Sequence, residues 1–229
     1  MLGPRAMTAL VLLSLCFRLI PSSARAQVQG KVGEPLVIRV RVFNVAQVCS
    51  RELARAQSVA REAFARAQIR SLWLDCTFLQ KGAPRPRECG ESFKPLDIAV
   101  ATLPRFGPEY GALQTSALGF AAMPGGEMLG HNAGISMERV VALATRHDVP
   151  AGLVLGLAMA HEIAHLLLGP GSHAAIGLMR TAWEGADLAK AARGDLSFTP
   201  EAGEELRVAI GRRQAREKRL MQALNTASP

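Results

Sequence analysis

Alternating apolar and polar positions predict strands in the first half of the chain. The segment 35–45, PLVIRVRVFNV, places Arg39 and Arg41 on one face and apolar side chains on the other, which is typical of a half-buried strand. The segments 69–76 (IRSLWLDC) and 95–103 (PLDIAVATL) indicate two further strands.

A helix is expected between the first two strands. Residues 50–68 are rich in Ala, Arg, Glu and Gln and contain no Gly or Pro. They predict an amphipathic helix of roughly five turns, which Ser50 can cap. A strand, a helix and a strand in this order predict a parallel pair joined by a right-handed crossover.

The middle of the chain is harder to assign. Gly and Pro interrupt residues 104–130, in which the segment 117–124 (ALGFAAMP) is a candidate for a short edge strand. The next segment, 134–147 (GISMERVVALATRH), fits either a strand or a helix.

The last third of the chain predicts helices. Residues 149–169 are apolar all round except for two histidines and one glutamate, so they predict a helix buried in the core, ended by Gly169 and Pro170. Two more helical segments follow, and the second begins at Thr199 and Pro200. The sequence therefore predicts an α+β fold whose helical part lies toward the C-terminus.

The first 26 residues have the pattern of a removable export signal. Arg5 precedes an apolar run at 7–20, and an A-x-A site ends at Ala26. We expect cleavage after Ala26, a secreted or periplasmic protein, and a single domain at 27–229; an uncleaved anchor is the alternative. The apolar run is short for a membrane span, and we expect no later segment to be long enough for one.

Charge and cysteine content narrow the classes of partner. The chain carries a net charge of +8, and removing the three arginines of residues 1–26 leaves +5. The densest basic stretch, 211–219, has no interleaved aromatic residues, so it predicts a solvated helix face and not a nucleic-acid site. In an oxidising compartment Cys76 and Cys89, which bracket a loop containing Pro and Gly, are expected to form a disulfide. Cys49 is expected to be buried.

The sequence HEIAH at 161–165 is a candidate metal site. Positions i and i+4 of a helix lie on one face, so His161 and His165 can direct ring nitrogens at one Zn²⁺. Glu162 lies beside them, where a carboxylate can accept a proton from water. The alternative is two histidines that bond to the backbone and a glutamate in an ion pair.

A catalytic zinc needs a third protein ligand, for which the sequence offers two candidates. His173 follows a sharp Gly-Pro-Gly-Ser turn that can bring it back to the metal. Glu184 follows His165 after 18 intervening residues, a spacing that resembles thermolysin-like and aminopeptidase-type enzymes with a His₂Glu site. We favour His173, because the Glu184 alternative leaves His173 and Met179 unexplained.

The stretch HEIAHLLLGPGSHAAIGLM resembles the metzincin class of zinc metalloproteases, whose pattern is H-E-x-x-H-x-x-G-x-x-H followed by a methionine turn. The resemblance implies a mixed twisted sheet with a crossover helix and a buried zinc-binding helix. It also implies His161, His165 and His173 as ligands, Glu162 as catalytic base and Met179 in the turn. The stretch also resembles small exported bacterial HExxH proteins of unassigned activity.

The sequence departs from that class in two ways. Three residues instead of two separate His165 from Gly169 and Gly169 from His173, so the loop is two residues longer. No tyrosine follows Met179, and the chain has only Tyr110.

Two functions are compatible with these residues. The first is an exported zinc-dependent peptidase, in which Glu162 acts as general base and a peptide or protein substrate is added to the edge strand. The second is a zinc-containing binding or scaffold domain with little activity. The presence of Glu162 favours the peptidase. His131 and His147 are expected to be incidental surface residues.

Overall fold

Five strands form one mixed sheet with the order β2-β1-β3-β5-β4. Four strands run parallel, and β4 pairs antiparallel with β5 at the edge. The strands are β1 (Val37–Asn44), β2 (Arg70–Asp75), β3 (Asp97–Leu103), β4 (Gly119–Ala122) and β5 (Asn132–Ser136). The expected parallel β-α-β unit is therefore confirmed, and the edge strand expected within 117–124 is β4.

The helices are α1 (Ser50–Arg66), α2 (Met137–Arg146), α3 (Ala151–Leu168), α4 (Gly185–Ala192) and α5 (Pro200–Thr226), with short 3₁₀ turns η1 (Arg87–Gly90) and η2 (Pro108–Tyr110). The computed structural model describes residues 35–77, 86–110, 117–123 and 130–226. The predicted export signal lies outside the described residues. From Pro35 onward, the described residues form one compact unit.

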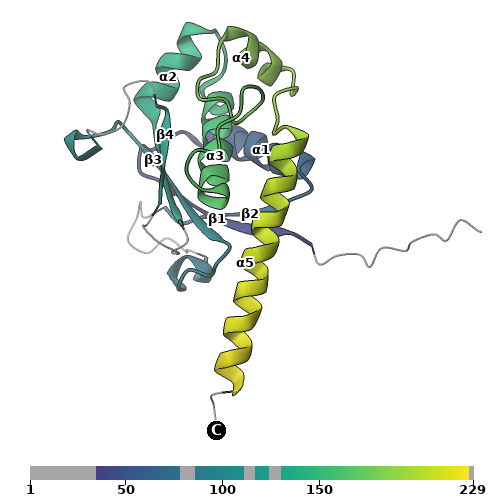
Figure 1. Ribbon diagram of the computed structural model, residues 1–229. Coiled ribbons are helices and arrows are strands. Elements are labelled where there is room, and N and C mark those ends of the chain that lie inside the picture. Colours follow the sequence, from purple (N-terminus) through teal and green to yellow (C-terminus); the bar gives the residue numbers. More distant parts are fainter. Residues whose placement is uncertain (1–34, 78–85, 111–116, 124–129, 227–229) are drawn as a thin grey trace, which may run out of the picture. The chain divides into compact units, whose positions relative to one another are not determined.

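Helices α1 and α3 pack side by side over one face of the sheet, and α1 lies behind α3 in Figure 1. Two glycines of α3 permit this close approach. A Cβ on Gly152 would lie 2.6 Å from the Glu52 carbonyl oxygen, and one on Gly156 would lie 2.5 Å from the Ala56 carbonyl oxygen. Both distances are shorter than van der Waals contact, so only glycine fits at these two positions.

Helix α3 is the core helix of the fold. By length and composition alone, this helix of 18 residues is long and apolar enough to cross a membrane. This corrects our expectation that no segment after the export signal would be long enough for a membrane span. In this fold 78% of the helix is buried against the sheet and the neighbouring helices. That is the burial expected of a core helix of a globular domain.

The second face of β1 is more buried than its sequence predicts. Arg41 is only 1% exposed, because the chain after η1 covers it: its guanidinium donates to the Glu91 carbonyl (2.7 Å) and pairs with Asp97 (2.6 Å). It also lies 4.3 Å from the ring of Phe93. The predicted Cys76–Cys89 disulfide is present.

Three local expectations need correction. The segment 134–147 is both a strand and a helix, because β5 ends at Ser136 and α2 begins at the next residue. Cys49, not Ser50, is the residue that precedes the first turn of α1, and it makes no side-chain cap. Cys49 is exposed and not buried, since it lies at this helix end on the surface.

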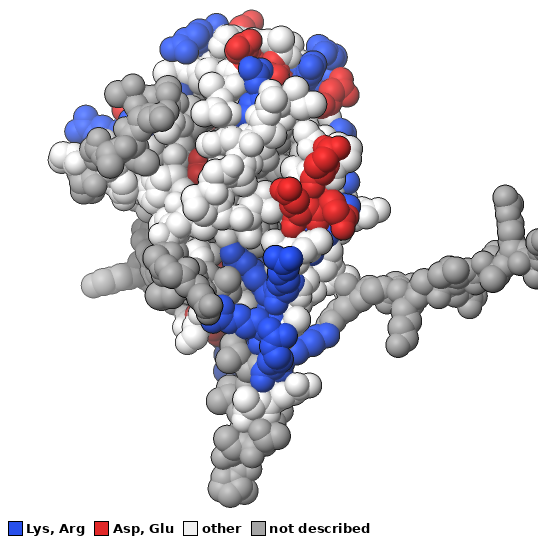
Figure 2. All heavy atoms as spheres, viewed as in Figure 1, with Lys and Arg blue, Asp and Glu red and all other residues white. Residues whose placement is uncertain are grey.

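Helix α5 runs past α3 and is joined to the core through Arg213. The Arg213 side chain is buried and donates to the carbonyls of Leu166, Pro95 and Gly130. Along α5, acids occupy the first two turns and basic residues dominate the middle of the helix, while the last turn has no basic residue. Figure 2 shows an acidic group above a basic group in the middle and lower parts of the viewed face, whereas both signs are mixed at the top.

Candidate metal centre

The three histidines of the predicted site come together at the C-terminal end of α3. His161 and His165 lie one turn apart on the helix. The helix ends at Gly169 (φ +101°), and Gly171 (φ +79°) turns the chain again, both conformations that L side chains rarely adopt. This turn returns His173 to the helix despite the two extra residues in the loop.

The Nε2 atoms of the three rings face one another. His165 Nε2 lies 3.0 Å from His161 Nε2 and 3.1 Å from His173 Nε2. Tetrahedral coordination with bonds of about 2.05 Å places neighbouring nitrogens about 3.3 Å apart. The observed spacing is within a few tenths of an ångström of that value, so the three rings can hold one metal ion.

Hydrogen bonds to the Nδ1 atoms fix the tautomers of two rings. His161 Nδ1 lies 3.0 Å from the Leu178 carbonyl oxygen, which can only accept, so Nδ1 carries the hydrogen. His165 Nδ1 lies 2.8 Å from Ser172 Oγ, and this hydroxyl donates its own hydrogen to the Gly169 carbonyl (2.9 Å). His165 therefore donates to Ser172, and the Nε2 atoms of both rings are left as lone-pair acceptors.

Two such acceptors 3.0 Å apart repel each other unless a cation lies between them. A proton is unsuited to be this cation at neutral pH, because the pKa of His165 is lowered to about 4. Burial is the largest cause, and the neighbouring His161 and His173 add to it. Burial also lowers the pKa of His161. A metal ion accepts several lone pairs at once, and neutral imidazole suits first-row transition metals such as zinc, copper, iron and nickel. The donor set thus fits a metal.

Glu162 lies next to this cluster, on the side of the edge strand. It is 7% exposed, and burial alone raises the pKa of its carboxyl to about 8. A Cβ on Gly119 of β4 would lie 2.7 Å from Glu162 Cγ, so glycine at this point of the strand makes room for the carboxyl. Within the described part of the chain, this carboxyl has no ion-pair partner, unlike the alternative considered from the sequence.

Met179 lies in a tight turn that contacts the histidine segments. The turn is closed by a bond from the Arg180 amide to the Gly177 carbonyl (3.3 Å), and Met179 is 1% exposed. Its carbonyl accepts from the amide of Ala174, directly after His173 (2.8 Å). The turn therefore supports the segment that carries the third histidine.

The structure also contains supporting groups that the sequence did not reveal. The Leu178 carbonyl accepts from Trp183 Nε1 (3.2 Å) as well as from His161, and the Trp183 ring stands edge-on to His161. Such groups orient metal-bound histidines in many sites. One weak indication of the role of Ser172 was present in the sequence, namely its position in the turn before His173. Nothing in the sequence indicated the role of the Leu178 backbone carbonyl.

The remaining candidates lie elsewhere. Glu184 is not part of the group of described residues that could hold a metal. Its side chain is 74% exposed, precedes α4 in a capping box with Asp187 and lies 3.5 Å from Arg180. His131 and His147 are partly buried and also lie outside the group.

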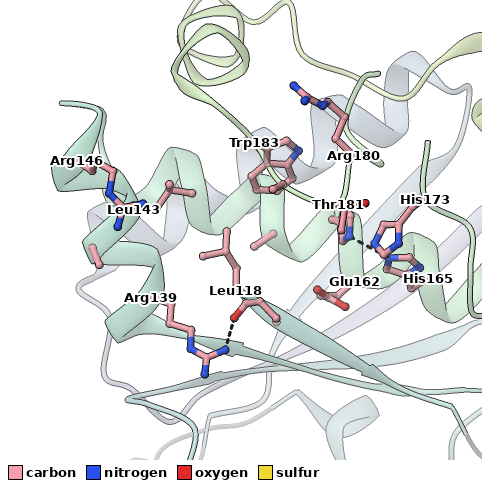
Figure 3. A pocket seen from close by; sticks show the side chains of 16 residues that line it. Leu118, Arg139, Leu143, Arg146, Glu162, His165, His173, Arg180, Thr181 and Trp183 are labelled. Atoms are coloured by element: carbon pink, nitrogen blue, oxygen red, sulfur yellow. Dashed lines mark hydrogen bonds between the residues drawn. The ribbon is translucent and has the colours of Figure 1, made fainter. Parts of the chain in front are cut away.

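A cleft of about 800 Å³ opens onto the cluster. It is bounded by Leu118 and Gly119 at β4, by α2 and by the segment 180–183. In Figure 3, Glu162 lies in the cleft between Leu118 and His165, and the α2 side chains stand on the opposite side from the histidines. The cluster is therefore accessible to a ligand larger than water.

Comparisons of the chain with protein-family models, with curated proteins and with solved structures give no match.

Proposed function

We propose that the protein is a zinc-dependent peptidase in which Glu162 acts as the general base. The observation that carries the proposal is a cluster of three converging imidazole nitrogens in an open cleft beside a sheet edge. Next to them lies one buried carboxyl that has no ion-pair partner among the described residues. A purely structural metal site is normally closed by four protein ligands, whereas a catalytic site keeps one position open.

His161, His165 and His173 would hold the metal through Nε2. The hydrogen bonds from Nδ1 to the Leu178 carbonyl and to Ser172 Oγ keep the first two rings in the tautomer required for binding. Zn²⁺ in such a site supplies Lewis acidity, which lowers the pKa of water to about 7 and polarises a carbonyl group.

Glu162 would act first as general base and then as general acid. Its carboxylate accepts a proton from the attacking water, and its carboxylic acid then returns that proton to the leaving amine. Burial raises the pKa of this carboxyl to about 8 in the metal-free protein, and a bound divalent cation would lower it toward neutral pH, where one group can perform both transfers. Its place between the histidines and β4 supports this role, because a substrate along the strand would have its bond beside this carboxyl.

The edge strand would bind the substrate backbone. β4 pairs with β5 on one side only and is the last strand in the sheet order. Its first residue, Gly119, and the preceding Leu118 line the cleft. An extended peptide can therefore add to this edge as a further strand and present its carbonyl groups to the site.

The resemblance to metzincins supports the proposal in part. A mixed sheet, a crossover helix, a buried helix that carries His161 and His165, and a turn at Met179 agree with the arrangement that the resemblance implied. The cleft in its described part has no tyrosine, since Tyr110 packs against Phe106 and Phe120. That observation favours the second candidate, a zinc-containing binding domain with little activity.

Export is part of the proposal. The Cys76–Cys89 disulfide is stable in an oxidising compartment, and the predicted signal at 1–26 would direct the chain to the periplasm or the exterior.

The test combines zinc content with hydrolysis of a mixed peptide library by the wild type and by Glu162→Gln. We expect the variant to retain zinc and to lose hydrolysis by at least about a hundredfold. Glu205→Gln, an exposed residue on α5, serves as the matched control and is expected to cleave like the wild type. Equal turnover by Glu162→Gln would remove Glu162 from the mechanism. Zinc binding without hydrolysis in the wild type would favour the binding domain.

A further inference from the structure

One wall of the cleft is a regular stripe of helix α2. Arg139, Ala142, Leu143 and Arg146 all line the cleft, and their spacing of three, four and seven residues places them on one face of the helix. Figure 3 shows Arg139, Leu143 and Arg146 along this wall, across the cleft from the histidines. The wall thus combines apolar surface with two guanidinium groups.

The arginines that line the cleft differ in their bonding partners. Arg180, on the opposite wall, pairs with Asp187 and lies 3.5 Å from Glu184, so its charge is compensated. Arg139 donates to the Ala117 carbonyl (2.6 Å). This bond ties its guanidinium to the chain just before β4.

Arg146 is placed to bind a ligand. It lies at the end of α2, is exposed and lines the cleft. Among the described residues it has no ion pair with a carboxylate, and the lining contains only one carboxyl, that of Glu162. Leu143, one turn earlier on the same face, offers apolar contact to the stem of a side chain that reaches Arg146.

We infer that the cleft selects substrates that carry a carboxylate able to reach the α2 wall and that Arg146 binds this carboxylate. The inference rests on the proposed peptidase function and adds a substrate class to it. The carboxylate belongs to an Asp or Glu side chain or to the free C-terminus of a peptide, since a guanidinium binds both in the same way. Arg146 is then a specificity-determining residue and takes no part in bond cleavage.

The experiment uses the zinc-loaded protein and a fluorogenic peptide series with one apolar frame. Three peptides are amidated at the C-terminus and carry Glu, Gln or Lys at one central position, which is varied along the frame. A fourth carries Gln and a free C-terminal carboxylate. We expect kcat/KM for the Glu peptide to exceed that for the Gln peptide by about tenfold at the best position, the size of one partly exposed charge-assisted bond. A preference for the fourth peptide alone assigns the carboxylate to the C-terminus.

Two charge reversals test the assignment to Arg146. Arg146→Glu is expected to abolish the preference for Glu and to favour Lys. The control is Arg61→Glu, an exposed position of α1 outside the cleft, which changes the net charge equally and is expected to keep the wild-type preference. An identical ratio of Glu to Gln cleavage in the wild type and in Arg146→Glu would overturn the inference.

Failure of the proposed function has a different signature. If no peptide is cut, fluorescence anisotropy measures binding of the labelled peptides to the wild type and to Arg146→Glu. Carboxylate binding that depends on Arg146 then supports the inference while refuting the peptidase. Cleavage of all peptides without regard to charge supports the peptidase and refutes the inference.

Discussion

The buried carboxyl of Glu162 should cost the metal-free protein stability as the pH rises. Burial raises the pKa of this group from 4.5 to about 8. Below pH 4.5 the carboxyl is protonated in both the folded and the unfolded chain and costs nothing. Between pH 4.5 and 8 the carboxyl ionises in the unfolded chain but stays protonated in the folded one. The free energy of unfolding therefore falls as the pH rises through that window.

The size of the effect follows from the same values. Each pH unit within the window lowers the free energy of unfolding by about 1.4 kcal/mol. Glu162→Gln removes the ionisation and keeps the shape of the side chain. Relative to the wild type, the variant should therefore gain about 3 kcal/mol between pH 5 and pH 7.5. The histidines are present in both proteins, so their titration cancels in the comparison.

The assay is urea unfolding of both proteins in the presence of a chelator at pH 5 and pH 7.5, followed by circular dichroism. Glu205→Gln, exposed on α5, controls for the loss of one negative charge and should show no such gain. A gain by Glu162→Gln that is equal at the two pH values would refute the reasoning. It would mean that the carboxyl is hydrated or paired in the folded protein.

Three further substitutions test the packing and the supporting bonds. Gly156→Ala should lower the unfolding free energy by about 2 kcal/mol, because its Cβ would meet the backbone of α1. The control Gly211→Ala, whose Cβ would have nothing within 4 Å, should raise the unfolding free energy by about 0.5–1 kcal/mol. A gain in both variants would contradict the close packing of α1 and α3. Ser172→Ala should weaken metal affinity by about tenfold in a chelator competition, because His165 loses the group that fixes its tautomer, and unchanged affinity would exclude that role. Arg213→Met should lower the unfolding free energy by about 3 kcal/mol, because three backbone carbonyls lose their donor, and a change below 1 kcal/mol would show that water replaces it.

The parts of the fold that sequence predicts best are those with a strong local pattern. Alternation predicted β1, the absence of Gly and Pro predicted α1, and the continuous apolar run predicted α3 as a buried helix. The two histidines one turn apart needed only helix geometry to be placed together. The disulfide was expected from the cysteines of an exported chain and from the loop with Pro and Gly that Cys76 and Cys89 bracket.

What the sequence did not predict depends on contacts between distant segments. Arg41 looked like a surface residue because its burial requires the chain around Phe93 to fold over β1. The division of 134–147 into β5 and α2 follows from the pairing of β5 with β3 and β4, which no local pattern reveals. The cleft wall of α2 likewise exists only because α2 packs beside α3.

The choice between His173 and Glu184 as third ligand also depended on tertiary structure. Both spacings were compatible with the sequence. The positive φ angles of Gly169 and Gly171 direct His173 to the cluster, whereas the capping box of α4 holds Glu184 away from it. The structure thus brings His173, and not Glu184, within reach of the other two histidines, a choice that spacing left open.

Metal content tests the central claim most directly. Purified wild type, His173→Ala and Glu184→Ala would be loaded with zinc, desalted and analysed by elemental mass spectrometry. We predict about one zinc per chain in the wild type and in Glu184→Ala, and a loss of most of it in His173→Ala. A wild type that binds no zinc, or a His173→Ala variant that retains a full equivalent, would contradict the three-histidine metal centre.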